Sequence, residues 1–502
     1  MYSRFILFLF IAITGSFFST VNAQRKRKVD IKRADVLEYN QVIVANAQRL
    51  IGNVVLRHDD VMMYCDSAYS YDNRNEVDAF GSIHITRGDT LHLYGDFLNY
   101  NGDSRLAKVR KRVKLIDKTL TLSTDSLDFN LESNIGYYNY GATIVDSTNV
   151  LTSTIGEYYT NDDFVLFKEN VVLENPDYRL ESDTLKYNTI TEKATILGPT
   201  DIYSEDMHLY SEDGWYKTID GLSHLYRNSM LEKGSQSLRG DTIIFNRDTK
   251  TGELLGSIEL RDTTNKIMVT GNRAIYNELT EIAVVTDSAI FHQFTDTDTL
   301  FLHADTLRTI PDIKNDEKVI QAFYGVRFFR TDLQGKCDSL VYWTVDSTLQ
   351  MFHEPILWSY ENQMSGRHIE MRSSPIEPDS VLLTRDAFIV SKEGENKFNQ
   401  VRGRDMLGYL KNQELYQIDV NGNAETVYYV KEEEEIIGVN KSEGSQLIIY
   451  IENRGFKKIS FLDHPLGIIQ PTQMLEEGDK KLKGFIWFEQ LRPKNSRDIF
   501  RE

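Results

Sequence analysis

Hydrophobic and polar residues alternate along almost the whole chain, in a pattern that returns about every 30 residues. Each copy opens with an Asp, carries an apolar residue two positions later and an aromatic residue four positions later. Residues two apart on a strand point to the same side, so the apolar and aromatic residues share one face. The clearest copies are Asp35–Tyr39, Asp96–Tyr100, Asp125–Phe129, Asp183–Tyr187, Asp241–Phe245, Asp338–Tyr342 and Asp405–Tyr409.

A second alternating stretch follows in each copy, about 15–20 residues further on. It begins after a Gly or Asn, which tolerates the backbone angles of a tight turn, so the sequence predicts a turn and then a second strand. Other turn residues stand between strands, as in Asp72–Asn75, Asn101–Asp103 and Asn246–Asp248. The second strands are predicted at Gly52–Leu56, Gly81–Ile85, Asn170–Leu173, Gly256–Leu260 and Gly325–Phe328.

Helical periodicity is nearly absent from this pattern. Short strands repeated in this way predict an all-β protein, an elongated open β-jellyroll or β-solenoid with one continuous core. Such a stack leaves strand edges exposed at its two ends, one near Ala34 and one near Gln446–Ile451 and Lys458–Leu462. These edges are where a partner is expected to add a strand.

The N-terminus has the pattern of a secretory signal peptide. An apolar run at Phe5–Ile13 precedes small residues at Val21–Ala23. The alternative is an uncleaved N-terminal anchor. No later stretch is apolar for long enough to cross a membrane as a helix, so a soluble mature protein is expected. The expected organisation is a signal peptide at 1–23, a basic segment at 24–33, the repeat at 34–437, and a last turn with a C-terminal tail at 438–502.

The net charge of the chain argues against one class of partner. The net charge is −18 and becomes −19 without the signal peptide, whose one charged residue is Arg4. A nucleic-acid partner is not expected, because phosphate groups require a basic surface. The basic cluster Arg25–Lys28 is interpreted as a solvated tail, with anionic lipid headgroups as the alternative contact.

Cys65 and Cys337 are nine repeats apart, roughly 40 Å at one strand spacing per repeat, so no intramolecular disulfide is expected.

A search for catalytic motifs finds no phosphate-binding Gly-rich loop, HExxH, CxxC or GxSxG sequence. We therefore expect no catalytic residue, no metal and no cofactor. His84 and His92 lie close in sequence and are expected on a solvent-facing surface. The Asp that opens each repeat could form the acidic ladder of a β-helix lyase. Capping of a strand or turn is the favoured interpretation of this Asp.

The apolar and aromatic stripe is the remaining candidate site. It forms the core of the stack, and in an open jellyroll it would also line a trough for lipid chains, whose burial contributes about 0.8 kcal/mol per methylene. The pattern does not decide between a filled core and an open trough. The candidate lipid-binding residues are Leu37, Tyr39, Leu98, Tyr100, Leu127, Phe129, Leu185, Tyr187, Ile243, Phe245, Leu340 and Tyr342.

The repeat form Asp-Ser/Thr-Leu-x-Tyr followed by Gly-x-Val-x-Leu, behind a signal peptide, resembles the OstA-like family. Proteins of that family resemble the LptA-type periplasmic bridge of lipopolysaccharide transport and the N-terminal domain of its outer-membrane partner. The resemblance covers roughly residues 30–495. The stretches that carry it are Ala34–Tyr39, Asn46–Leu56, Cys65–Asp96, Asp183–Ile202 and, for long members, Gly484–Pro493.

The resemblance implies an open β-jellyroll that holds the acyl chains of lipid A and pairs head to tail with like domains. The expected protein is thus a non-enzymatic, lipid-carrying bridge in lipopolysaccharide export to the outer membrane. Its expected partners are lipopolysaccharide or lipid A, jellyroll transport proteins of both membranes, and further copies of itself. Its expected location is the periplasm, free or associated with the outer membrane. The chain is much longer than the short bridge proteins, and a structural or glycan-binding envelope solenoid and a β-helix polysaccharide lyase are the alternatives.

Overall fold

A computed structural model describes residues 28–39, 46–118, 120–146, 148–312, 317–344, 347–373, 379–411, 414–432, 435–452, 455–463 and 465–501. These residues form forty strands and three short 3-10 turns. The prediction of an all-β, jellyroll-like fold is confirmed. In the described part of the chain, no helix is long and apolar enough to cross a membrane. The predicted signal peptide lies outside the described residues.

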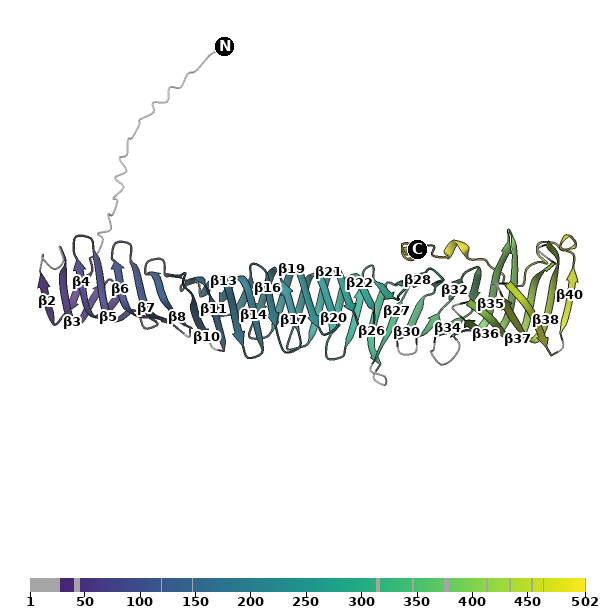
Figure 1. Ribbon diagram of the computed structural model, residues 1–502, viewed down its shortest axis with the longest axis horizontal. Coiled ribbons are helices and arrows are strands. Elements are labelled where there is room, and N and C mark those ends of the chain that lie inside the picture. The colour runs from purple at the N-terminus through teal and green to yellow at the C-terminus, as the bar shows by residue number, and fades with distance from the viewer. Residues whose placement is uncertain are drawn as a thin grey trace, which may run out of the picture. The chain divides into compact units, whose positions relative to one another are not determined.

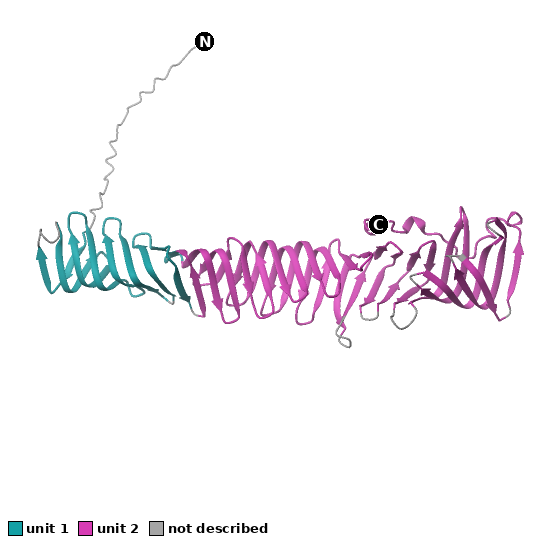
Figure 2. Cartoon of the chain, in the orientation of Figure 1, with its two compact units in different colours: residues 1–147, 157–162 teal, residues 148–156, 163–502 magenta. Residues whose placement is uncertain are grey.

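The chain divides into two compact units, shown in Figure 2. Unit 1 comprises residues 1–147 and 157–162, and unit 2 comprises residues 148–156 and 163–502. The short strand β12 (Ile155–Tyr159) belongs in part to each. The strands of unit 1 are β1 (Asp30–Arg33), β2 (Val36–Tyr39), β3 (Gln48–His58), β4 (Val61–Tyr71), β5 (Glu76–Arg87), β6 (Leu91–Asn101), β7 (Leu106–Asp117), β8 (Leu120–Asn130), β9 (Ile135–Tyr138) and β10 (Ala142–Asp146).

Unit 2 holds the remaining strands, which mostly follow one another in chain order (Figure 1). Its 3-10 turns are η1 (Thr472–Met474), η2 (Glu489–Leu491) and η3 (Asp498–Phe500). Its strands are β11 (Asn149–Ser153), β13 (Phe164–Asn175), β14 (Tyr178–Asn188), β15 (Lys193–Ile196), β16 (Thr200–Tyr203), β17 (His208–Ser211), β18 (Asp213–Lys217), β19 (Leu222–Lys233), β20 (Gln236–Asn246), β21 (Thr251–Asp262), β22 (Ile267–Asn277), β23 (Ile282–Thr286), β24 (Ile290–Phe294), β25 (Thr299–His303), β26 (Thr306–Asp312), β27 (Glu317–Phe323), β28 (Arg327–Arg330), β29 (Leu333–Lys336), β30 (Ser339–Trp343), β31 (Thr348–Phe352), β32 (Ile356–Ser359), β33 (Asn362–Ser365), β34 (His368–Arg372), β35 (Asp379–Gly394), β36 (Lys397–Lys411), β37 (Glu414–Glu432), β38 (Glu435–Glu452), β39 (Gly455–Leu462) and β40 (Leu466–Gln470).

Three of the Gly-containing segments predicted as turns before a new strand, those at Gly52, Gly81 and Gly256, are β-bulges inside continuous strands. The prediction holds at Gly325, which lies in a bend between β27 and β28. Strand β3 runs through Gly52 and Asn53, and its register with β4 shifts between Ile51 and Val54. Both bulge residues have positive φ, 79° and 42°, which Gly and Asn adopt at the lowest cost. The sequence signal for left-handed backbone was therefore correct, but it marks a bend in a strand and not its start. Gly81 and Gly256 occupy the same kind of position in β5 and β21.

The bulges divide each unit into two layers. Strand β14 shows the division, because its C-terminal half (Leu185–Asn188) pairs with β15 while its N-terminal half (Arg179–Ser182) pairs with β16. Strand β8 divides in the same way between β9 and β10 in unit 1. In each unit we call the layer that carries the motif's apolar and aromatic residues layer A, and the other layer B. Alternate residues of both layers are buried between them.

Several of the Asp residues that open a repeat contact a bulge of the next strand. The carboxylate of Asp66 accepts a hydrogen bond from the Ser82 hydroxyl at 3.0 Å, and Asp241 accepts one from Ser257 at 3.1 Å. A Cβ on Gly81 would stand 2.2 Å from the Asp66 Oδ2 atom, so the carboxylate fills the space that this glycine leaves. Asp66 and Asp241 thus bind the side chain of a bulge residue in the next strand, and they form no acidic ladder with each other.

The C-terminal segment, residues 471–501, covers the face of layer B that points away from the interior of unit 2. The side-chain amide of Gln363 donates to the carbonyl of Ile486 at 2.9 Å and accepts from the N–H of Phe488 at 2.7 Å. Gln400 does the same with Lys480 and Leu482, at 2.9 and 2.8 Å. Both glutamines are almost fully buried, so this segment adds a third layer over that part of the sheet.

Candidate functional site

The apolar and aromatic residues of the repeat line the interior between the layers. Ten of the twelve candidate residues are buried, and Tyr342, at 8% exposure, is the most accessible of them. Leu37 and Tyr39 differ, with 57% and 60% of their surface exposed, because β2 is a terminal strand that pairs with β3 alone among the described strands. The buried candidates are Leu98, Tyr100, Leu127, Phe129, Leu185, Tyr187, Ile243, Phe245, Leu340 and Tyr342.

Layer B supplies the opposite wall of the interior, which the list of candidate residues omitted. Its inward positions alternate like those of layer A and are fully buried at many points. The sequence does indicate this wall, because apolar and polar residues also alternate in the second stretch of each repeat. Examples of this wall are Leu56, Ile85, Leu93, Leu115, Leu122, Leu173, Leu180 and Ile202.

The outer ends of the two layers meet along a line away from the bulges, which we call the seam. Polar pairs close the seam at several places, and a tyrosine hydroxyl takes part in four of them. The hydroxyl of Tyr100 lies 2.6 Å from the Nδ1 atom of His58, and Tyr158 donates to Asp117 at 2.8 Å. The remaining two are Asn149 with Tyr187, at 3.1 Å, and Gln293 with Tyr342, at 3.0 Å.

These seam pairs join residues about 40 to 50 positions apart, one from each layer. Burial raises the pKa of Tyr100, so its hydroxyl is protonated and available to donate. Where the aromatic residue is Phe129, the seam is spanned instead by the guanidinium of Arg87, which donates to the carbonyl of Leu131 at 2.7 Å. The two layers are therefore held together by buried polar contacts as well as by apolar packing.

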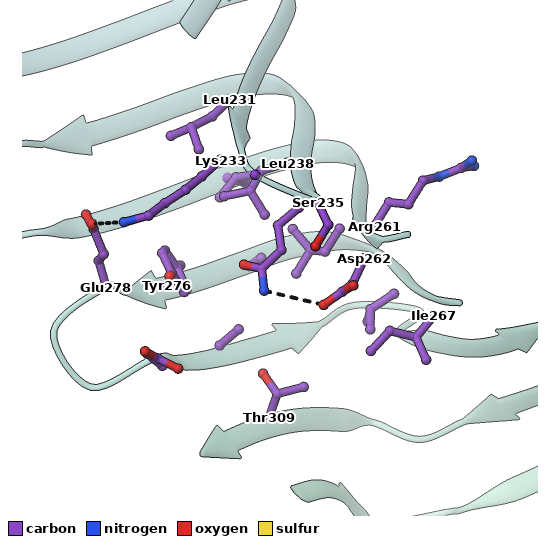
Figure 3. Close-up of a pocket in the computed structure, with 18 of the residues that line it drawn as sticks. Leu231, Lys233, Ser235, Leu238, Arg261, Asp262, Ile267, Tyr276, Glu278 and Thr309 are labelled. Carbon is purple, nitrogen blue, oxygen red and sulfur yellow. Dashed lines mark hydrogen bonds and ion pairs between the residues drawn. The ribbon is translucent and has the colours of Figure 1, made fainter. Parts of the chain in front are cut away.

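In unit 2 the interior opens into a cavity of about 490 Å³, which lies between β19–β23 and the β26–β27 hairpin (Figure 3). This volume is within the range of sites that hold small ligands. Phe245, Leu254, Ala274 and Ala283 line it from layer A. The wall from layer B consists of Leu231, Leu238, Leu260, Ile267 and Val269.

The mouth of this cavity is charged, while its floor is apolar. Lys233 lies 2.8 Å from Asp206 and 2.8 Å from Glu278, and these two ion pairs raise the pKa of Lys233. The Lys233–Glu278 pair, drawn as a dashed line in Figure 3, joins the end of β19 in layer B to the residue that follows β22 in layer A. On the other side Lys318 lies 4.0 Å from Asp262. An apolar chain inside the cavity would therefore have charged groups at its solvent end.

A second opening of about 280 Å³ lies beside Tyr342. Leu300, Phe328 and Leu349 contribute to its apolar lining, and Arg330 and Asp332 to its rim. Its position next to another candidate residue agrees with an interior that is only partly filled. At these two places a cavity adjoins the repeat face, so side chains do not fill the interior completely there.

Reactive groups offer no competing site in the described residues. Among them, no group of three or more His, Cys, Asp or Glu side chains is arranged to hold a metal ion. His84 and His92 lie 3.2 Å apart, nitrogen to nitrogen, and stack with Tyr94 on a part-buried surface. Cys65 and Cys337 are both buried free thiols, and burial raises the pKa of each to about 12, which keeps them unreactive.

Comparison with known proteins agrees with the sequence resemblance. Residues 26–183 match the family described as OstA-like protein, so the resemblance is confirmed over unit 1 and the first strands of unit 2. This family is associated with lipopolysaccharide and lipid transport, and it is a transport or binding family and not an enzymatic one. Its members are typically periplasmic. No curated protein matches the chain.

Proposed function

We propose that this protein carries lipid through the periplasm in lipopolysaccharide export to the outer membrane, with the acyl chains held between layers A and B. The observation that carries the proposal is the cavity of about 490 Å³ that opens from the apolar interior beside the repeat residue Phe245. The match of residues 26–183 to a lipid-transport family supports it independently.

The interior suits acyl chains for a physical reason. Moving an acyl chain from water into an apolar site contributes about 0.8 kcal/mol for each methylene group. A lipid with several chains therefore needs a long apolar surface to cross an aqueous compartment. Inward residues such as Leu127, Leu185 and Leu340 recur with the repeat and give such a surface within each unit.

The terminal strands fit partners of the same fold. In the described part of the chain β1 and β2 pair with β3 alone, and β39 and β40 pair with β38 alone. Each of these strands has one neighbouring strand in that part of the chain, and a strand of another jellyroll is proposed to pair at the opposite side. The proposed partners are therefore jellyroll transport proteins of the inner and outer membranes, and further copies of this chain joined head to tail.

Site-specific photocrosslinking tests this function. A photoactivatable phenylalanine analogue placed at Tyr100, Phe129 or Tyr187 should form an adduct with purified lipopolysaccharide. The same analogue at Lys108 or Lys114, which are exposed on β7, is the matched control and should form none. Adducts at the exposed positions alone, or at none, would contradict a lipid-filled interior and would favour a glycan-binding surface or a structural role.

A further inference from the structure

Two successive stretches of unit 2 repeat each other with a shift of 58 residues. Strands β13 and β14 span Phe164–Asn175 and Tyr178–Asn188, while β19 and β20 span Leu222–Lys233 and Gln236–Asn246. The strand lengths are the same, and the bulges at Glu169–Asn170 and Arg227–Asn228 correspond as well. Residues related by this shift therefore occupy equivalent positions in the two stretches. A difference between two such residues shows how the interior differs at that position.

The seam is closed in the first stretch. The side-chain amide of Asn149 donates to the hydroxyl of Tyr187 at 3.1 Å, and the Asn175 amide donates to the side-chain oxygen of Asn149 at 2.9 Å. Deeper inside, the rings of Tyr178 and Tyr216 pack edge to face with their centroids 5.0 Å apart. Both rings are 5% exposed, so these two tyrosines occupy the interior at this level.

The second stretch carries smaller or apolar residues at the equivalent positions. Met207 stands where Asn149 stands, and Phe245 stands where Tyr187 stands, so the polar seam pair has no counterpart. Gln236 replaces Tyr178 and Ala274 replaces Tyr216, which removes both interior rings. All four replacing residues line the cavity of about 490 Å³. The cavity is thus the direct result of these four substitutions between repeats.

A charged contact takes over the closure of the seam at this point. Lys233 is the equivalent of Asn175, and it reaches across the seam to Glu278 at 2.8 Å. The side chains of this pair are 41% and 21% exposed, whereas Asn149 and Tyr187 are completely buried. An exposed ion pair contributes little net stability and opens at a lower cost than a buried hydrogen bond. The seam is therefore weaker beside Phe245 than beside Tyr187.

We infer that the cavity beside Phe245 is a lateral port, through which the acyl chains of a lipid pass between the interior of unit 2 and its surroundings. The inference rests on the proposed function and adds the place of passage. The Lys233–Glu278 pair spans the port, and Met207, an unbranched and adaptable side chain, lines it. The lipid headgroup stays outside, among the charged residues of the rim.

A variant that copies the closed stretch tests the port. Met207→Asn and Phe245→Tyr restore the seam pair, and Gln236→Tyr and Ala274→Tyr restore the interior rings. The probe is purified lipopolysaccharide, and its loading is followed over time by photocrosslinking from Leu185 in the full chain. Loading should become at least tenfold slower than in the unaltered port. Loading at an unchanged rate, in a variant with unchanged circular dichroism, would overturn the port.

A second variant closes the port without repacking the interior. Lys233→Cys and Glu278→Cys are joined by a bis-maleimide, which leaves the buried Cys65 and Cys337 untouched in the folded protein. The same double variant without the reagent is the control. The bridge should slow loading at least tenfold, and equal rates with and without the bridge would overturn the port. If the unaltered protein forms no adduct at Leu185, the proposed function itself fails, and this outcome is distinct from both others.

Discussion

Asn149 in layer B donates a hydrogen bond from its side-chain amide to the hydroxyl of Tyr187 in layer A, at 3.1 Å. The bond joins residues that lie 38 positions apart and are both completely buried. It makes the aromatic residue of the repeat a contact between layers as well as a part of the apolar core. At the equivalent position of the following stretch stands Phe245, which lacks this hydroxyl and lines the cavity.

Removal of this hydroxyl should loosen the seam locally. Tyr187→Phe leaves the buried Asn149 amide without this acceptor, which should cost about 1–3 kcal/mol of local stability. Hydrogen exchange of the β11 and β14 amides should become faster in this variant. Tyr140→Phe removes a hydroxyl from a ring that is 78% exposed and should leave the exchange rates unchanged. Equal effects of the two substitutions would contradict a specific role of the seam pair.

Glycine at a bulge should be required because of the neighbouring carboxylate. Gly81→Ala places a side chain at positive φ, at a cost of about 1–2 kcal/mol, and adds a contact of 2.2 Å with Asp66. Gly88→Ala meets the same kind of φ, with nothing within 4 Å of the new Cβ. Gly81→Ala should therefore lower the thermal midpoint more than Gly88→Ala. In an Asp66→Ala background the difference should shrink, and its persistence would refute the role of Asp66.

The His84–His92 pair should make the stability of unit 1 depend on pH. Burial, and then the charge of His92, lower the pKa of His84. The unfolded chain therefore binds more protons than the folded chain below the ordinary histidine pKa of about 6.5, so stability falls as the pH is lowered from about 7 to 5. His84→Phe keeps a ring against Tyr94 and should reduce this dependence in denaturation curves. His353→Gln, at an exposed site, should not alter it.

The two glutamines under the C-terminal segment should hold it in place. Gln363→Ala together with Gln400→Ala removes four hydrogen bonds to the backbone of this segment. Limited proteolysis should then cut between residues 471 and 501, and the emission of Trp487 should shift to longer wavelength. Gln446→Ala, at an exposed position, is the control. Resistance to the protease in the double variant would show that apolar packing alone fixes the segment.

Much of the interior could be predicted from the sequence, because residue alternation specifies the buried face of a strand. Leu127, Phe129 and Leu185 were assigned to that face correctly, since each lies within a strand that has neighbours on both sides. Leu37 and Tyr39 have the same pattern, but β2 has a neighbour on one side only, so the pattern could not show their exposure.

Other features depend on contacts that a repeat motif does not record. Gly52–Asn53 has the same composition in a turn and in a bulge, and strand pairing decides between the two. The seam pair His58–Tyr100 joins positions 42 residues apart, a separation that the repeat spacing does not single out. The cavity follows from differences between repeats, such as Ala274 in place of Tyr216. A repeat motif contains only the residues that the repeats share, so it does not show these differences.

Identification of the molecule that the protein carries tests the central claim most directly. The full-length protein is purified from its native envelope without strong detergent, and bound lipid is measured by native mass spectrometry. A variant with Leu127→Asp, whose fold is checked by circular dichroism, is compared in parallel. The proposed function predicts lipopolysaccharide or its lipid A portion bound to the unaltered protein and reduced in the variant. A protein without bound lipid, or with equal lipid in both forms, would contradict it.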